Sequence, residues 1–146
     1  MKLPSRAWDG VDTGNRQARG GAMDWWRRIL FCVGGLYGAL GVAASAMAAH
    51  IVASDMLVTA SHFLLFHAVA LVAVGAASAA VDGGRPALLT GASALALGTF
   101  LFTGDLALRV LSEGEYHWGT APYGGSVLIV GWLFVAIGGL LASKKA

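Results

Sequence analysis

Five ionisable side chains lie within or beside long apolar segments, and their types could do chemistry: His50, His62, His67, Asp105 and Arg109. Polar groups at membrane depth are costly, so each is a candidate for ligand binding or for a proton path. Asp105 and Arg109 are four residues apart with the acid first, the favourable order for an ion pair on a helix. The pair either neutralises itself and ties its helix to its neighbours, or supplies a carboxylate beside His62 that binds a proton or a ligand.

The histidines are poorly spaced for shared coordination. His62 and His67 are five residues apart, so on a helix they point about 140° away from each other. They cannot both bind one metal ion or one haem, and no second histidine matches the depth of His67. We expect His67 to be a neutral imidazole that is hydrogen-bonded to a facing helix. His50, His62 and Asp105 could form an oxygen-and-nitrogen metal site, but helix lengths do not show that they converge. We therefore predict no metal and no cofactor.

The sequence contains no recognisable catalytic set. It has no G-x-S-x-G elbow, no H-E-x-x-H motif and no paired intramembrane aspartates. The first apolar segment also lacks the carboxylate expected of a small multidrug exporter. We predict a non-enzymatic membrane protein that packs with itself or with a membrane complex. The alternatives are a small proton-linked transporter or channel, with its polar path in the outer half of the membrane, and a cofactor-binding electron carrier.

Four apolar segments must position these side chains, at about residues 29–49, 57–80, 87–110 and 122–142. A helix of about 20 residues crosses about 30 Å of hydrocarbon, and each segment has that length. The chain is 57% hydrophobic and 12% charged, with a mean hydropathy of +0.69. A water-soluble domain of 146 residues does not need so much apolar sequence. We therefore predict an all-α integral membrane protein in contact with the lipid bilayer.

The positive charges indicate the orientation. Nine of the ten Lys and Arg residues flank the same side of the four segments, and Arg109 is the tenth. This bias predicts that both termini are cytoplasmic (N-in/C-in). Trp25 and Trp26 suit the inner interface, and Tyr116, Trp118 and Tyr123 suit the outer one. The pI near 9.0 reflects juxtamembrane charge rather than nucleic-acid binding. The single cysteine, Cys32, excludes an intramolecular disulfide.

The polar ends are predicted to lie outside the transmembrane domain of residues 29–142. Residues 1–28 are expected to form a disordered, basic cytoplasmic leader, and residues 143–146 a cytoplasmic tail. Met23 would serve equally well as a start. An alternative remains for the first segment, because Arg27 and Arg28, an apolar run and an A-x-A pattern imitate a secretory signal. Cleavage after Ala46 or Ala48 would leave three helices and an outside N-terminus.

Short links between the apolar segments predict an antiparallel four-helix bundle, in which sequential neighbours pack together. In lipid, close backbone approach must supply much of the packing energy, and small residues allow it. The small residues predicted to pack helices are Gly34, Gly38, Gly41, Ser45, Ala94, Gly98, Gly104, Gly124, Gly125 and Gly131.

Four stretches of the chain, in order, resemble a known family across about residues 29–141. Ser45-Ala-Met-Ala-Ala-His50 resembles the G-A-x-G-A-H stretch of the YgdD-like small inner-membrane proteins, and residues 66–71 (FHAVAL) are similar to their Y-H-A-L-A-L core. Residues 101–108 (LFTGDLAL) resemble the F-S-G-S-L segment, and residues 121–125 (APYGG) with Gly131-Trp132 look like the P-x-G-G…G-W signature.

This resemblance implies a four-helix bacterial inner-membrane protein of a family without an established activity, and it supplies no reaction. The chain departs from the family pattern at several positions. Ser45 and Ala48 replace glycines, Asp105 stands where a serine is common, and Arg109 stands where an apolar residue is common. The Asp105–Arg109 pair is therefore expected to be a trait of a subgroup.

Overall fold

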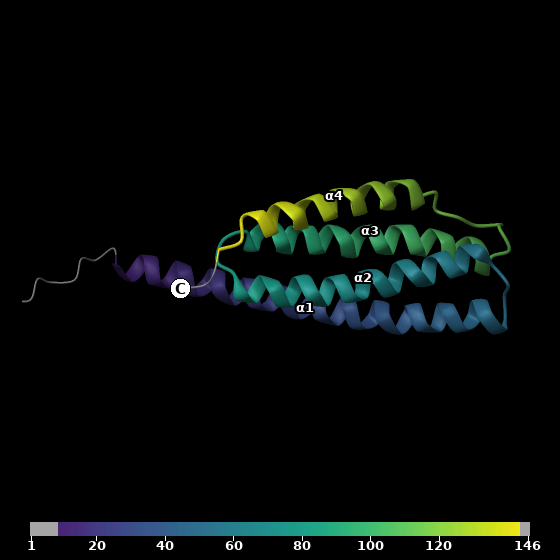
Figure 1. Ribbon diagram of the computed structural model, residues 1–146, viewed down its shortest axis with the longest axis horizontal. Helices are drawn as coiled ribbons and strands as arrows, with labels where there is room; N and C mark the ends of the chain where they lie inside the picture. The colour runs from purple at the N-terminus through teal and green to yellow at the C-terminus, as the bar shows by residue number, and fades with distance from the viewer. Residues whose placement is uncertain (1–8, 144–146) are drawn as a thin grey trace, which may run out of the picture.

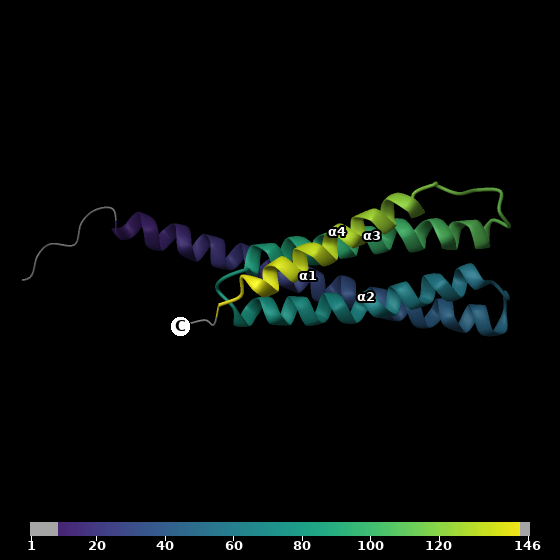
Figure 2. The same cartoon turned by 45° about the horizontal axis from the view of Figure 1, so that its top comes forward.

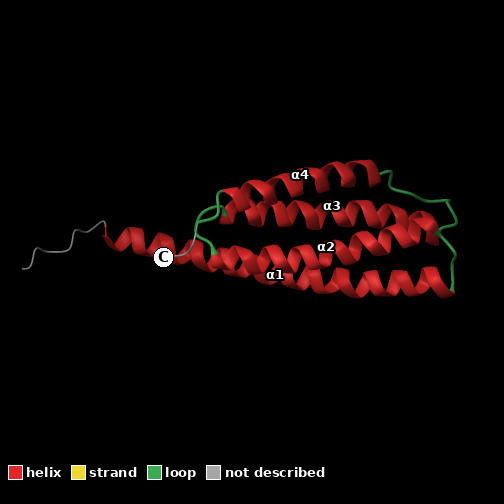
Figure 3. Cartoon of the chain, viewed as in Figure 1, coloured by secondary structure: helices red, strands yellow, loops and turns green. Residues whose placement is uncertain are grey.

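The computed structural model describes the backbone of residues 9–143 and the side chains of residues 21–143. This part of the chain is all-α (Figure 3), with helices α1 (Asp9–His50), α2 (Asp55–Ala80), α3 (Arg85–Leu111) and α4 (Ala121–Leu140). Each helix contains a segment that is long and apolar enough to cross a membrane; in α1 this segment is Gly21–His50.

The helices lie side by side in the order α1, α2, α3, α4, and the chain reverses direction at each connection (Figure 1). α1 packs against α2, α2 against α3, and α3 against α4, while α1 also touches α3. The turned view shows α4 crossing over α3 and the first part of α1 extending beyond the other helices (Figure 2). The hydrophobic core lies between these packed helices and includes Leu30, Leu64, Leu71, Leu95 and Leu128.

Residues 9–28 differ from the expected leader, because α1 begins at Asp9 and continues without a break into the apolar segment. The prediction of disorder was therefore wrong for residues 9–28, whereas residues 1–8 and the end of the tail, 144–146, lie outside the described residues. Extending an existing helix adds one hydrogen bond for each residue fixed, so a long apolar helix can propagate into a polar sequence that would not nucleate alone. The other helices begin and end within two residues of the expected bounds.

Local sequence explains where these helices start. The Ser54 hydroxyl accepts from the Leu57 amide at 3.4 Å at the start of α2. Gly84 precedes α3 with φ of +73°, a left-handed conformation that favours glycine. Pro86 and Pro122 stand in the first turns of α3 and α4, where a missing N–H costs nothing.

A glycine seam brings α3 and α4 into backbone contact. Gly91 and Gly98 on α3 face Gly131 and Gly124 on α4, and a methyl group added to Gly98 would lie 2.9 Å from the Gly124 carbonyl oxygen. The glycines repeat every seven residues along each helix, and Gly138 continues the α4 series opposite Gly84. A seven-residue repeat keeps one stripe of each helix facing its partner along the whole contact.

The predicted packing residues divide into two groups. Gly34, Gly41, Gly98, Gly124 and Gly131 lie in tight helix contacts, while Gly38 makes only an ordinary contact with Ala68. Gly104 faces the Trp118 ring instead of a helix, Ala94 is half-buried, Ser45 is exposed, and Gly125 has open space beside it. The packing role was therefore wrongly assigned to Ser45 and Gly125, because the small size of a residue does not show whether its face of the helix meets a neighbour. Gly91 and Gly138 were missed.

Gly98→Ala tests the seam, with Gly125→Ala as a matched control on α4. The added methyl at residue 98 meets backbone atoms that cannot rotate away, so we expect a loss of about 1–3 kcal/mol in unfolding free energy. At residue 125 the methyl enters open space, and the change to alanine should be neutral or stabilise by up to about 1 kcal/mol. Reversible unfolding in mixed detergent micelles measures both. Equal effects of the two substitutions would contradict the seam.

Candidate functional site

The structure pairs Asp105 with Arg109 and gives none of the three candidate histidines a hydrogen bond or ion pair with either. Asp105 is fully buried and His67 is 6% exposed, whereas His50 and His62 are exposed. Among the described residues, no group of three His, Cys, Asp or Glu side chains could hold a metal ion. His50, His62 and Asp105 therefore do not form the oxygen-and-nitrogen site considered above.

Asp105 binds the connection between α3 and α4. One carboxylate oxygen, Oδ1, accepts from the amides of Trp118 at 2.7 Å and Gly119 at 2.9 Å. The other, Oδ2, accepts from the Ala121 amide at 3.3 Å. Ala121 is the first residue of α4, so a side chain of α3 takes up one of the amides left unpaired at a helix start. A negative charge at a helix N-terminus is also electrostatically favourable.

The local sequence prepares this arrangement. Asp105 follows Gly91 and Gly98 at the same seven-residue interval, so it lies on the face of α3 that meets α4. Gly119, with φ of +67°, turns the connection toward the carboxylate. The Thr120 hydroxyl donates to the Leu101 carbonyl of α3 at 2.9 Å, and it makes no cap for its own helix. Asp105 therefore takes the place of the Thr120 side chain as the hydrogen-bond acceptor at the start of α4.

Arg109 is a secondary partner of Asp105. Its Nη2 lies 3.4 Å from Oδ2, which is longer than the usual 2.7–2.9 Å of a charge-assisted bond. The side chain is 39% exposed, while that of Asp105 is fully buried. The ion pair predicted from the four-residue spacing is therefore present, but three backbone amides are the main partners of the carboxylate. Sequence reasoning missed those amides.

His67 hydrogen-bonds within its own helix. Its Nδ1 donates to the Phe63 carbonyl at 2.8 Å, so the expected bond to a facing helix is wrong. The ring stacks on Phe63 and lies 6.0 Å from the Trp132 ring of α4. The Phe63 carbonyl belongs to the preceding turn of the same helix, so this bond needs no partner helix. Nε2 is buried without a partner among the described residues.

His62 does not contribute to the carboxylate site. It is exposed on α2 beside Phe66, with ring centroids 6.1 Å apart. The four described partners of Asp105 are Arg109 and the three amides of the α3–α4 connection. Among the described residues, His62 is therefore not a hydrogen-bond partner of Asp105, as a proton path through both would require.

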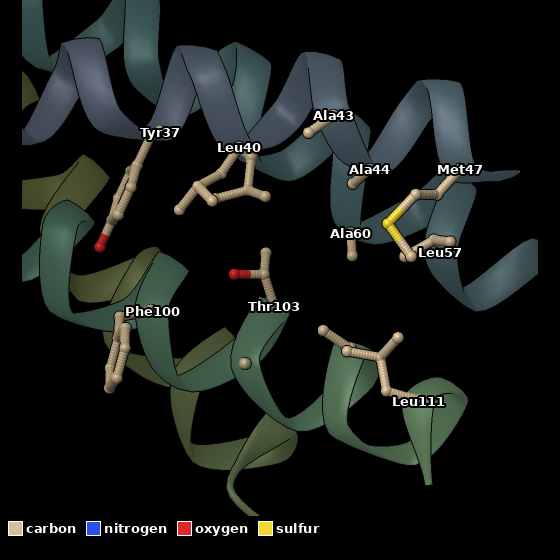
Figure 4. Close-up of a pocket in the computed structure, with 13 residues that line it drawn as sticks. Tyr37, Leu40, Ala43, Ala44, Met47, Leu57, Ala60, Phe100, Thr103 and Leu111 are labelled. Atoms are coloured by element: carbon tan, nitrogen blue, oxygen red, sulfur yellow. The ribbon is translucent and has the colours of Figure 1, made fainter. Parts of the chain in front are cut away.

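An apolar groove opens between α1 and α3 over α2, with a cavity volume of about 250 Å³ (Figure 4). We call it the α1–α3 groove. Small residues leave the space, and larger ones border it; the lining includes Leu40, Ala43, Ala44, Met47, Ala60, Phe100, Gly104, Ala107 and Leu111. Two hydroxyls also line it, but the Tyr37 hydroxyl donates to the Ala96 carbonyl at 2.6 Å and the Thr103 hydroxyl donates to the Thr99 carbonyl at 2.7 Å. The groove therefore suits an apolar occupant.

The four helices are long and apolar enough to cross a membrane, which defines a multi-pass membrane protein. It has a buried carboxylate that binds the α3–α4 connection and an apolar groove on the surface of its helices. Residues 35–125 match the family model described as "Protein of unknown function (DUF423)". The chain belongs to this family, because the match covers more than half of its 146 residues. This confirms the predicted membership in a small family of unknown function. No solved structure matches the chain.

A double-mutant cycle at Asp105 and Arg109 separates the amide contacts from the ion pair. Asp105→Ala leaves three amides and one guanidinium without their acceptor, so we expect a loss of about 3 kcal/mol in unfolding free energy. Arg109→Leu removes an ion pair whose distance is long and whose guanidinium is partly exposed, so the loss in unfolding free energy should be under about 1 kcal/mol. The double variant should be no more stable than Asp105→Ala.

Thermal unfolding of the four proteins in one detergent gives the coupling energy. Asp105→Asn serves as the conservative control, since it keeps one acceptor oxygen for the amides of Trp118 and Gly119 and should lie between wild type and Asp105→Ala. Substantial recovery of stability in the double variant would mean that the ion pair, and not the amide set, is the main role of the carboxylate.

Proposed function

We propose that this protein is a non-enzymatic membrane protein of the bacterial inner membrane, which acts by packing with a second copy of itself through the α1–α3 groove. The observation that carries this proposal is the groove itself, a hollow in the transmembrane surface whose two hydroxyls are already bonded. Alanine and glycine at its walls permit close approach of another helix, which is how helices associate in lipid.

The exposed face of α4 supplies suitable side chains for such a contact. The seam turns Gly124, Gly131 and Gly138 toward α3. Ile129, Leu133 and Leu140 are left at least half exposed. Large apolar side chains on one copy and a groove lined by alanines on another are complementary in shape. The contact would join two different surfaces, so it must close into a ring to form a finite oligomer.

The alternative of a proton-linked transporter or channel receives less support. Its polar path would use Asp105, Arg109 and His62. These are a buried structural carboxylate, a partly exposed guanidinium and an exposed histidine of α2. The surface of the helices is therefore the better candidate for the functional part of the molecule.

For the membrane arrangement we propose an antiparallel bundle with both termini in the cytoplasm. Arg27 and Arg85, from α1 and the start of α3, both pair with Asp24, at 3.1 and 3.0 Å, so their charges gather at one end of the helices. The positive-inside bias assigns that end to the cytoplasm. The signal-peptide alternative would remove most of α1, including the buried side chains of Leu30 and Tyr37.

Reporter fusions test this orientation. Alkaline phosphatase fused after Ala146 should be inactive, and the same enzyme fused after Gly114, in the α3–α4 connection, should be active, because it folds only outside the cytoplasm. The opposite pattern would reverse the orientation, and activity at both positions would indicate an odd number of crossings.

Filling the groove tests self-association. Ala43→Leu with Ala107→Leu adds apolar volume that lipid-exposed helices tolerate, so membrane insertion should be retained while oligomers are lost. Native mass spectrometry of detergent-released protein should show oligomers for wild type and monomers for the variant. Val69→Leu, an exposed site on α2 outside the groove, is the control and should remain oligomeric. A monomeric wild type would refute the proposal.

A further inference from the structure

Arg109 borders two hollows at the end of the molecule where α3 meets the α3–α4 connection. The first, of about 460 Å³, is lined by Arg109 together with Val52, Ser54, Glu113 and His117. The second, of about 510 Å³, is lined by Arg109 together with Phe102, Leu106, Pro122 and Gly125. Met56 also belongs to both. We call the first the polar hollow, because Ser54, Glu113 and His117 line it, and the second the apolar hollow, because Arg109 is the one polar side chain among its described lining residues. Both meet at the guanidinium.

Most of the bonding capacity of this guanidinium is unused. A guanidinium carries five N–H donors, and the described residues accept one bond from Arg109, the 3.4 Å contact with Asp105. Nε is buried and has no partner among the described residues. Asp105 cannot compensate by moving closer, because its carboxylate is already held by three amides of the α3–α4 connection.

The position of Arg109 at the end of a membrane-spanning helix limits what can complete its bonding. Two turns back along α3, Phe102 borders the apolar hollow, so a ligand must carry an anion beside Arg109 and a hydrocarbon chain toward Phe102 and Leu106. A phospholipid has this arrangement, since its phosphate lies at the interface and its acyl chains run into the hydrocarbon. Arginine is well suited to phosphate because its donors form a planar fork.

Glu113 indicates which headgroup fits. This carboxylate lines the polar hollow with Arg109 and lies four residues further along the chain, just beyond the end of α3. An anionic headgroup would be repelled there, whereas the ammonium of ethanolamine would be attracted while the phosphate contacts Arg109. We propose that Arg109 and Glu113 form a binding site for one phosphatidylethanolamine molecule, with an acyl chain in the hollow bordered by Phe102, Leu106 and Pro122.

This site lies against α2, α3 and α4, and it shares no lining residue with the α1–α3 groove. It needs only a phospholipid leaflet at that end of the helices, so it does not depend on which end faces the cytoplasm. Loss of self-association and loss of lipid binding are therefore separate outcomes.

Native mass spectrometry of the full-length protein, incubated with equimolar phosphatidylethanolamine and phosphatidylglycerol in mild detergent, tests the site. Wild type should retain one phosphatidylethanolamine, and Arg109→Leu should reduce its occupancy at least about tenfold, as expected for loss of hydrogen bonds to a charged group. Arg109→Lys should retain part of the binding, because it keeps the charge but not the fork. Arg28→Leu should bind as wild type does, because this exposed arginine of α1 lies near Arg27, at the opposite end of the helices from Arg109.

Glu113→Gln separates headgroup choice from phosphate binding. It should abolish the preference for phosphatidylethanolamine over phosphatidylglycerol while total phospholipid occupancy persists. Thermal unfolding of each variant in the same detergent shows whether a loss of lipid reflects a loss of fold. Equal occupancy in Arg109→Leu and wild type, or a wild-type preference for phosphatidylglycerol, would overturn the proposal.

Discussion

Backbone contact between α3 and α4 is the constraint on which the rest of this molecule depends. Lipid is as apolar as leucine, so two helices gain little from burying large side chains against each other and much from close approach. Gly91 and Gly98 admit the backbone of α4, and Gly124 and Gly131 admit that of α3. Asp105 occupies the next position of the same stripe, where α4 has not yet begun and the connection takes its place. The seam that starts with glycines thus ends with a carboxylate that binds backbone amides.

The same carboxylate affects the surface of the helices. By accepting from the Trp118 amide it holds that residue over α3, where the indole ring lies close to Gly104 and 6.0 Å from the Phe100 ring. Gly104 and Phe100 both line the α1–α3 groove. The α3–α4 connection therefore supports one wall of the groove from behind, and the buried charge and the apolar surface belong to one structural unit.

Asp105 and Arg109 have different roles although they are neighbours on one helix. The carboxylate is fully buried and its bonds are directed inward to the connection, whereas the guanidinium is partly exposed between two hollows. Burying a charge in a membrane protein is tolerable when several donors satisfy it, and three amides meet that need for Asp105. Arg109 then retains N–H donors that the described residues do not use.

The sequence by itself determined the four apolar segments and, apart from the start of α1, the approximate bounds of the helices, because hydrophobic length is a local property that one segment displays alone. Its motifs also indicated the membership in a family of unknown function. It also placed glycines where close packing was needed, though it assigned that role wrongly to Ser45 and Gly125. Only the tertiary structure decided which face meets which neighbour. The amides that bind Asp105 come from residues 13 to 16 positions further along the chain, and the groove is formed by side chains of three helices. The seven-residue interval from Gly91 through Gly98 to Asp105 was visible in the sequence, but an interval shows that residues share a face and does not identify what lies opposite.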